Sequence, residues 1–253
     1  EDALAFYRAH YTPANAVLVV AGDVTAEQVK VLAEKYYGVL KNTFTPEPRV
    51  RTAEPDPIAS RRVTLVDARA ASPVMQRSYL APSYATANGR EALALDLLAD
   101  ILGSGTQSRL YKNLVVDQKI AAHAAAWYSG DQLDSGTFGV YGAPNPGADV
   151  AKVEAAIDAI LADVLKNGVT QKELDRVRNQ AIAERVYTLD NQAALARMAG
   201  VALTTGLSAR SIFDRDLDIE KVTLNDIKQA AEKFIVLKRS VTGILLPETQ
   251  TLN

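Results

Sequence analysis

Residues 120–143, IAAHAAAWYSGDQLDSGTFGVYGA, hold two strand patterns around a polar turn that contains glycine. The strands are predicted at Ile120–Tyr128 and Gly136–Ala143, and so short a connection favours antiparallel pairing. Because alternate residues of a strand point to the same side, His123, Ala125 and Trp127 are expected to share one face.

A second pair of strand patterns precedes this one, at Val63–Ala68 and Val74–Ala81. Apolar periodicity predicts helices at 90–102, 107–118, 148–166, 171–188, 190–205, 208–217 and 224–234, and a final strand at 240–246. Strands in consecutive pairs followed by runs of helices indicate an α+β fold, with a mostly antiparallel sheet packed by helices. Gly168 after Asn167 is typical of a helix end, and Thr170 with Glu173 predicts a capping box, as does Thr25 with Gln28.

The first forty residues form a separate segment. Helices are predicted at 2–11 and 25–37, with a strand at 17–21 between them. One strand and two helices cannot build a layered domain. Residues 1–40 are therefore expected to be the tail of a first domain whose remainder lies upstream of Glu1. Four prolines, Pro46, Pro48, Pro55 and Pro57, predict an extended linker over 41–60, and 61–253 is expected to be a second α+β domain.

The chain also matches itself at an offset of 224 residues. This shift places Asp2 on Asp226, His10 on Phe234 and Val17 on Val241, so that helix, turn and apolar strand coincide. Few identities survive, and helix–turn–strand units are common. Both a true duplication and a coincidence therefore remain open.

Composition excludes several classes of function. The net charge is −2 with both signs interspersed, which argues against a nucleic-acid surface. No apolar run is long enough to span a bilayer. The absence of cysteine removes disulfides, thiolate metal sites and cysteine nucleophiles. The sequence does not identify the cellular compartment. The chain is expected to be soluble, and to lie in the periplasm or the cytoplasm if it is bacterial.

No residue pattern in the sequence identifies an active site. His10 and His123 are the only histidines, and neither belongs to a zinc motif. A capping or half-buried role is expected for His10, and a partly buried or edge position for His123. The turn Gly103–Tyr111 could face an anion, but a turn between helices explains it equally well, and nucleotide-induced thermal shift would separate the two.

Two charged stretches are interpreted as solvated surface. One is a set at helical spacing: Lys172, Asp175, Arg176 and Asn179. The other is the acidic run Asp214–Glu220, which lacks the glycine and the ordered ligand spacing of a calcium loop.

Three segments together resemble the M16 zinc peptidases, the pitrilysin and mitochondrial processing peptidase-like family. FYRAHYTPANAVLVVAGDVTAEQVKVLAEKYYG (6–38) resembles the end of that family's first domain. LGSGTQSRLYKNLVVDQKIAA (102–122) and NGVTQKELDRVRNQAIAERVYTLDNQAALARMAG (167–200) resemble the early helices and the long helical hairpin of its second domain. The likeness covers nearly the whole chain in the right order.

The resemblance implies a zinc metalloendopeptidase that hydrolyses peptides in an enclosed chamber. The family's zinc ligands, His-x-x-Glu-His and a distant glutamate, sit in the first domain, ahead of the segment with which this chain begins. None of them transfers to a residue of this sequence. This portion is therefore expected to confine substrate, and to be inactive and free of zinc on its own.

The family's second domain often supplies an arginine and a tyrosine that contact substrate, in the pattern Leu-Arg-x-x-x-Gly-Leu-Ala-Tyr. Leu114–Ala122 occupies this window, with Val115 in place of the arginine and Ala122 in place of the tyrosine. The resemblance implies a zinc-bearing chain in a homo- or hetero-oligomer, whose partner subunit carries the Arg/Tyr pair. The alternative is a non-catalytic structural subunit related to these peptidases.

Overall fold

The computed structural model describes residues 1–47, 50, 55 and 57–248. The chain divides into two compact units. The smaller comprises Glu1–Pro55 and Arg185–Ile212, and the larger comprises Asp56–Glu184 and Phe213–Asn253. Part of the predicted linker, residues 48–49, 51–54 and 56, lies outside the described residues.

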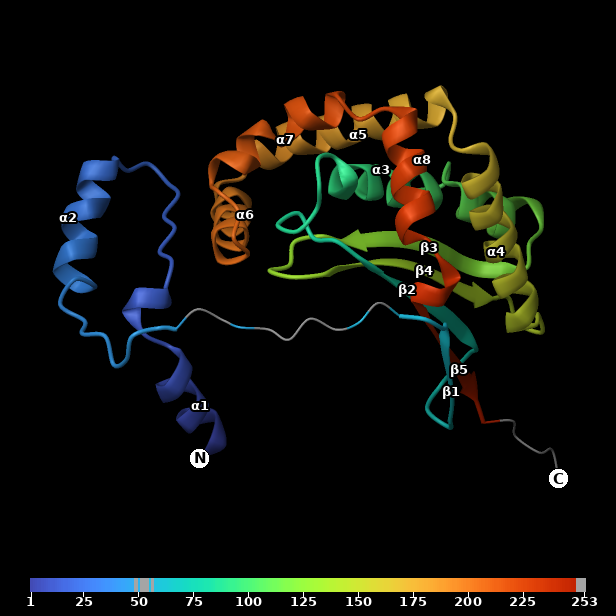
Figure 1. Cartoon of the computed structure of the whole chain (residues 1–253), viewed down its shortest axis with the longest axis horizontal. Helices are drawn as coiled ribbons and strands as arrows, with labels where there is room; N and C mark the ends of the chain where they lie inside the picture. The colour runs from blue at the N-terminus through green and yellow to red at the C-terminus, as the bar shows by residue number, and fades with distance from the viewer. Residues whose placement is uncertain (48–49, 51–54, 56, 249–253) are drawn as a thin grey trace. The chain divides into compact units, whose positions relative to one another are not determined.

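The larger unit is built on one five-stranded sheet (Figure 1). Its strands are β1 (Arg61–Asp67), β2 (Val74–Ala81), β3 (Ala121–Ser129), β4 (Gly136–Pro144) and β5 (Ser240–Pro247). They lie in the order β1-β5-β2-β4-β3. Only β1 and β5 pair in parallel, and the other three pairs are antiparallel. The predicted α+β fold with a mostly antiparallel sheet is confirmed.

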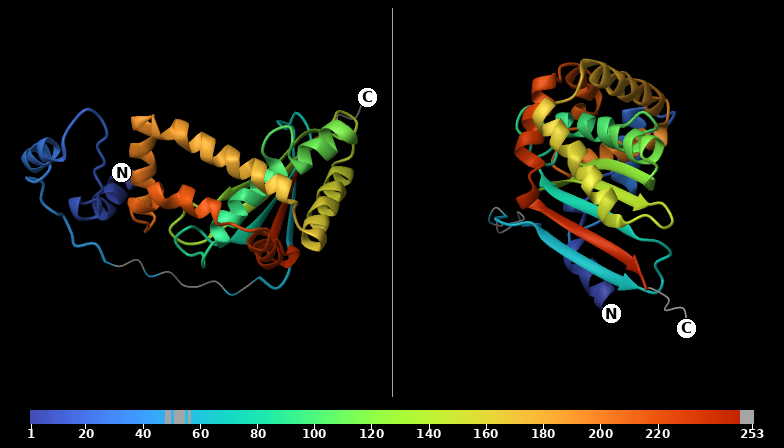
Figure 2. Two further views of the ribbon diagram at one scale, coloured as in Figure 1. Left: turned by 90° about the horizontal axis from the view of Figure 1, so that it is seen from above. Right: turned by 90° about the vertical axis from the view of Figure 1, so that its right-hand side faces the viewer.

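Helices pack against one face of this sheet (Figure 2). The helices that carry the packing are α3 (Glu91–Gly103), α4 (Val150–Asn167) and α8 (Leu224–Phe234). Fully buried side chains such as Met75 of β2, Leu98 of α3 and Ile227 of α8 form one core between helices and sheet. Helices α5 (Gln171–Leu189) and α7 (Arg210–Glu220) begin and end in different units.

The predicted caps are confirmed. Gly168 follows α4 with φ of +75°, a conformation that favours glycine. Thr170 N donates to Glu173 Oε2 at 2.8 Å while Glu173 N donates to Thr170 Oγ1 at 3.3 Å. In the smaller unit, Gln28 N donates to Thr25 Oγ1 at 3.2 Å and starts α2 (Ala26–Tyr36) in the same way.

The helix predicted over 107–118 is wrong in type. After a short α-helical start, residues Tyr111–Asp117 form a π-helical segment, η2. Its end is marked by Gln118 N, which donates to the Asn113 carbonyl five residues back at 2.9 Å. The apolar pattern of so short a segment cannot distinguish a π-helix from an α-helix. Leu114 is the buried residue of the π-helical segment.

The smaller unit contains α1 (Asp2–His10), a 3₁₀ turn η1 (Pro13–Asn15), α2 and α6 (Gln192–Thr204). The strand predicted at 17–21 is wrong, because no described residue pairs with this segment. An extended segment becomes a strand only through hydrogen bonds to a neighbour. Val17, Leu18 and Val20 are exposed.

The internal match at 224 residues extends to local structure. The 3₁₀ turn η3 (Leu237–Arg239) lies 224 positions after η1. Helix α8 precedes η3 as α1 precedes η1. The two copies differ after the 3₁₀ turn, since β5 pairs in the sheet and residues 16–20 do not. Both copies thus share a helix followed by a 3₁₀ turn, a common connection after helices.

Candidate functional site

One face of the sheet is free of the helices that cover the other. On β2, Met75, Arg77 and Tyr79 are buried on the helix side, while the alternate residues Gln76, Ser78 and Leu80 point the opposite way. Cross-strand pairing extends this second face over β4 and β3. We define the open face by the residues that line it: Gln76, Ser78, Leu80, His123, Ala125, Trp127 and Tyr141.

The aromatic residues of the open face are held by specific contacts. The His123 ring meets the Tyr141 ring edge-on, with ring centroids 5.7 Å apart. Trp127 is paired with Gly139 of β4, and its ring occupies the space that a side chain at 139 would take. The expectation that His123, Ala125 and Trp127 share one face is confirmed. His123 is exposed on β3, which lies at the edge of the sheet, as expected.

Gly139→Ala is expected to displace Trp127. A Cβ atom at 139 would lie 2.2 Å from Trp127 Cζ2, so the ring must leave the sheet surface. We expect a loss of about 1–3 kcal/mol in the free energy of unfolding and a red-shifted Trp emission. Trp127 is the only tryptophan, so the emission reports on this face alone.

Gly243→Ala is the matched control, because the nearest atom to its Cβ position is 3.9 Å away. It should leave the emission unchanged. Unaltered emission in Gly139→Ala would show that the ring does not rest on Gly139.

The two family positions differ in their surroundings. Val115, in η2, is half-buried and packs against the core. Ala122 is exposed and forms a bulge, since Ala121 pairs with Pro144 and His123 with the adjacent Ala143. Neither side chain can donate a hydrogen bond.

Lys119, which the sequence did not single out, is the one non-glycine residue in the described part of the chain with positive φ, +54°. It stands where the family pattern has glycine. That glycine was the signal that could have revealed the left-handed conformation.

The donor set does not fit zinc. His10 and His123 lie in different units. Among the described residues, no three His, Cys, Asp or Glu side chains are grouped so that they could hold a metal ion. His10 is exposed, so the half-buried position expected for it is wrong. Its ring stacks on Phe6 with ring centroids 4.2 Å apart. Its backbone carbonyl accepts a hydrogen bond from Asn15 Nδ2 at 2.9 Å.

A buried polar cluster lies beside α3, on the helix side of the sheet. Tyr84 Oη donates to Asp96 Oδ2 at 2.5 Å, and the Arg215 guanidinium stacks over the Tyr84 ring at 4.1 Å. Burial raises the pKa of Asp96. Burial and the nearby Asp96 raise the pKa of Asp100, one turn further along α3, to about 6. Arg215 also donates to Asp131 Oδ1 at 3.4 Å, so this cluster joins α7 to the loops that follow β2 and β3.

Asp100→Asn is expected to stabilise the protein at neutral pH. The folded pKa lies above the ordinary 3.8, so the carboxyl favours folding below that value and loses this benefit as the pH rises through about 6. After allowance for partial exposure, we expect a gain of about 1–2 kcal/mol at pH ~7.5 that shrinks towards pH ~4.

Chemical unfolding at both pH values measures this effect, with the exposed Asp117→Asn as control. An equal gain at both pH values would contradict the assignment to Asp100.

Residues 1–181 match the family profile described as the peptidase M16 inactive domain, which is more than half of the chain. The chain belongs to the peptidase M16 family. The resemblance found in the three sequence segments is thereby confirmed, and the matched part is the family's inactive domain.

Curated relatives of this M16 chain include a zinc protease and a processing peptidase subunit. It is 24% identical over 250 residues to the zinc protease PqqE of Helicobacter pylori, covering 98% of this chain and 55% of the relative. It is 26% identical over 256 residues to the mitochondrial-processing peptidase subunit beta of Saccharomyces cerevisiae, covering 96% and 54%. The chain thus spans about half the length of the curated relatives it matches.

Solved M16 structures share the fold. A protease from Helicobacter pylori matches with a TM-score of 0.88 at 24% identity, over 97% of this chain and 59% of the other. The peptidase M16 inactive domain from Pseudomonas fluorescens matches with a TM-score of 0.74 at 17% identity, over 90% and 52%. None of the helices among the described residues is long and apolar enough to cross a membrane.

Proposed function

We propose that this M16 chain binds and confines peptide for a zinc metalloendopeptidase, and that its open face forms one wall of the chamber in which hydrolysis takes place. The observation that carries the proposal is the open face itself. Its aromatic side chains, Trp127 and Tyr141, lie beside the small residue Ala125 and the polar Gln76. Such a surface offers apolar contact and hydrogen bonding to an extended peptide of varied sequence.

The outer edge of β3 supports the same function. Among the described residues, β3 pairs only with β4, so its other edge keeps unpaired backbone groups. An extended peptide can add to such an edge through main-chain hydrogen bonds. Side chains of the added strand would alternate between the open face and the helix side, which would limit sequence preference to every second residue.

We propose the domain organisation expected from the sequence: 1–40 as the tail of a first M16-like domain, 41–60 as a linker and 61–253 as the second domain. The offset of 224 residues supports it. The buried face of α8 includes Ile227 and Phe234, and these align with the exposed Ala3 and His10 of α1. The α1 face would be covered by the remainder of a first domain, as the α8 face is covered here.

Zinc and its chemistry would belong to that first domain of the whole protein. Val115 and Ala122 would leave the substrate contacts of the family pair to a partner subunit. This arrangement predicts that the present chain binds peptide without cleaving it. The alternative, a non-catalytic interaction subunit, predicts that the whole protein also fails to cleave.

Titration of the chain with a tryptophan-free peptide tests the binding role. The probe is three repeats of Ser-Val-Gln-Leu-Thr, and the readout is Trp127 emission. We expect a saturable change that Tyr141→Ala weakens about tenfold, a loss of about 1.4 kcal/mol. The control is Tyr187→Ala, which removes a tyrosine that is 77% exposed on α5. No change in emission up to millimolar peptide, with circular dichroism showing intact folding, would refute the proposal.

A further inference from the structure

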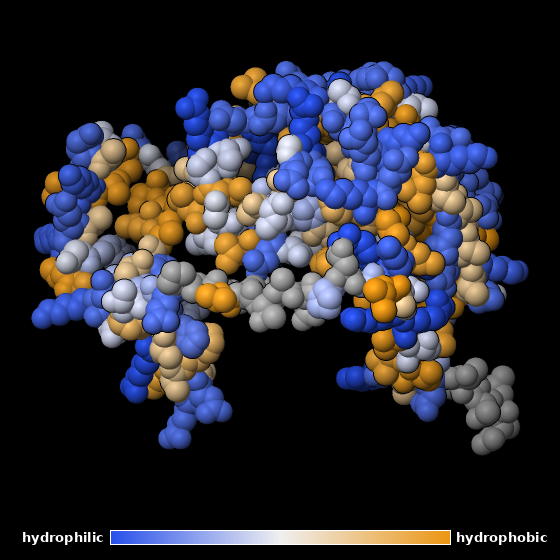
Figure 3. Space-filling view, in the orientation of Figure 1, coloured by the Kyte–Doolittle hydropathy of each residue, from blue (hydrophilic) through white to orange (hydrophobic). Residues whose placement is uncertain are grey.

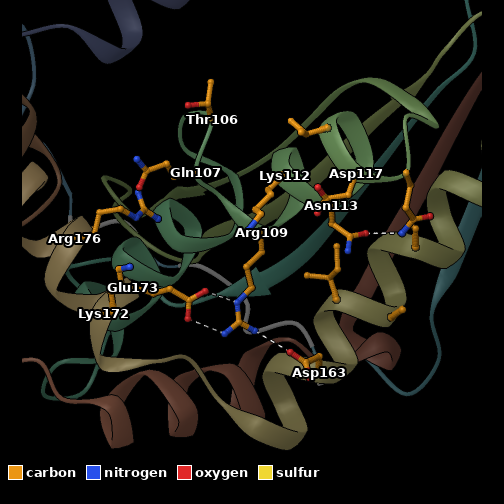
Figure 4. A pocket seen from close by; sticks show the side chains of 15 residues that line it. Thr106, Gln107, Arg109, Lys112, Asn113, Asp117, Asp163, Lys172, Glu173 and Arg176 are labelled. Atoms are coloured by element: carbon orange, nitrogen blue, oxygen red, sulfur yellow. Dashed lines mark hydrogen bonds and ion pairs between the residues drawn. The ribbon is translucent and has the colours of Figure 1, made fainter.

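A groove of about 1090 Å³ lies in the larger unit between η2, α4 and the start of α5 (Figure 4). It is formed by helical elements and shares no residue with the open face. Its floor is apolar, with Val116 of η2 and Ala156, Ala159 and Ile160 of α4. Val116 is 49% exposed although it is a large aliphatic side chain.

Charge around this floor is already neutralised on one side. Arg109 Nε donates to Glu173 Oε1 at 2.7 Å and its Nη1 donates to Asp163 Oδ2 at 3.0 Å. The guanidinium also donates to the Gly168 carbonyl at 3.2 Å. Burial alone would raise the pKa of Glu173, but hydrogen bonds from Arg109 and Thr170 outweigh it and lower this pKa to about 2. The Arg109 cluster therefore fixes the wall of the groove and leaves little charge for a ligand.

The other three cations that line the groove do not form a cluster of ion pairs like that of Arg109. Lys112 and Lys172 are exposed, and the structure gives neither an ion pair within the described residues. Arg176 is half-buried, and its Nη2 atom is buried with no hydrogen-bond partner among the described residues. Figure 4 shows the Arg176 side chain directed from α5 to the side of the pocket where Gln107 lies.

The lining carries four cations and three carboxylates, and Arg109 already engages two of those carboxylates: Asp163 and Glu173. Within the lining, Lys112, Lys172 and Arg176 then face one remaining acid, Asp117. Arg176 is also attracted to Asp100 of α3, outside the lining. The groove therefore suits a ligand that carries both negatively charged hydrogen-bond acceptors and apolar groups.

We infer that the groove binds an acidic, amphipathic peptide segment of a partner protein. Aliphatic side chains of this segment would lie on Val116 and Ile160, and its carboxylates would accept from Arg176 and Lys172. The apolar floor distinguishes such a segment from a free phosphate or a nucleotide, which needs no aliphatic surface of this extent. The site does not depend on peptide binding at the open face.

Fluorescence anisotropy with a fluorescein-labelled peptide, three repeats of Glu-Leu-Ala-Glu, tests the inference on the intact chain. The neutral counterpart, three repeats of Gln-Leu-Ala-Gln, should bind about tenfold more weakly or not at all. Raising the salt concentration from about 0.05 M to about 0.5 M should weaken the binding of the acidic peptide. Equal affinity for the two peptides would overturn the proposal.

Two variants locate the site. The double variant Lys172→Gln with Arg176→Gln should lower the affinity about tenfold, whereas Lys228→Gln, on α8 outside the groove, should not. Ala159→Tyr should block the floor, and Ala162→Tyr, at an exposed alanine of the same helix outside the lining, is its control. Wild-type binding by both groove variants would overturn the assignment, as would displacement of the peptide by ATP or inorganic phosphate at equal concentration.

Discussion

Replacing Gly103 by alanine is expected to lower the free energy of unfolding by about 3 kcal/mol. A Cβ atom at this position would lie 1.7 Å from Ala126 N and 2.6 Å from the Ala125 carbonyl carbon, both in the backbone of β3. Backbone atoms of a paired strand cannot rotate away, so the end of α3 would have to move off the sheet. Such a movement would open the core around Ile101 and Leu102, which are fully buried.

Urea unfolding followed by circular dichroism measures this loss. Gly200→Ala in α6 is the matched control, because it places the same methyl group in a helix with no atom within 4 Å. It should stabilise the protein by up to about 1 kcal/mol through helix propensity. If Gly103→Ala were as stable as the wild type, the close packing of α3 on β3 would be wrong.

Arg77→Ala is expected to cost about 3–5 kcal/mol, the usual effect of breaking a buried ion pair. Arg77 projects from β2 beneath α4 with a side chain that is 4% exposed. Its Nε donates to Thr242 Oγ1 at 2.8 Å, its Nη2 to Glu154 Oε1 at 2.6 Å, and its Nη1 to Asp158. Removing the guanidinium leaves Thr242 Oγ1 without its donor and takes the buried ion pair from Asp158, while Glu154 keeps only Arg62.

Arg62→Ala is the matched control, since Arg62 pairs with the same Glu154 at 2.7 Å but is 53% exposed. Its loss should cost less than about 1 kcal/mol. Hydrogen bonds from Arg62 first, and then from Arg77, lower the pKa of Glu154. Stability from this carboxylate is therefore present above its ordinary pKa of 4.5 and is lost as the pH falls below it. Equal losses for the two arginines would contradict a buried role for Arg77.

The order of elements in the larger unit could be predicted because each carries a local signal. Strand patterns beside turn residues predicted β2 and β4, and the Thr170–Glu173 capping box marked the start of α5. The strand expected at 17–21 failed because a strand depends on a partner, which local sequence does not specify. Hydrophobic side chains gather over the β1–β5 end of the sheet in Figure 3, where Val63 and Leu65 are exposed, and no local pattern predicts that exposure.

The candidate sites were predicted unequally. The shared face of His123 and Trp127 followed from strand geometry alone. The helix predicted over 90–102 extends to Gly103, whose lack of a side chain serves a contact with β3 that local sequence does not indicate. Arg176 was grouped with a solvated helix face, because the groove beside it is made by η2 and α4, which are distant in sequence.

Mapping the bound peptide by photo-crosslinking tests the central claim most directly. The Ser-Val-Gln-Leu-Thr repeat peptide would carry a benzophenone side chain, and mass spectrometry would locate the crosslinks on the chain. Peptide held on the open face should crosslink to Gln76, Trp127 or Tyr141. Crosslinks confined to the helical groove, or spread over the helices with none on the open face, would contradict a peptide-binding wall.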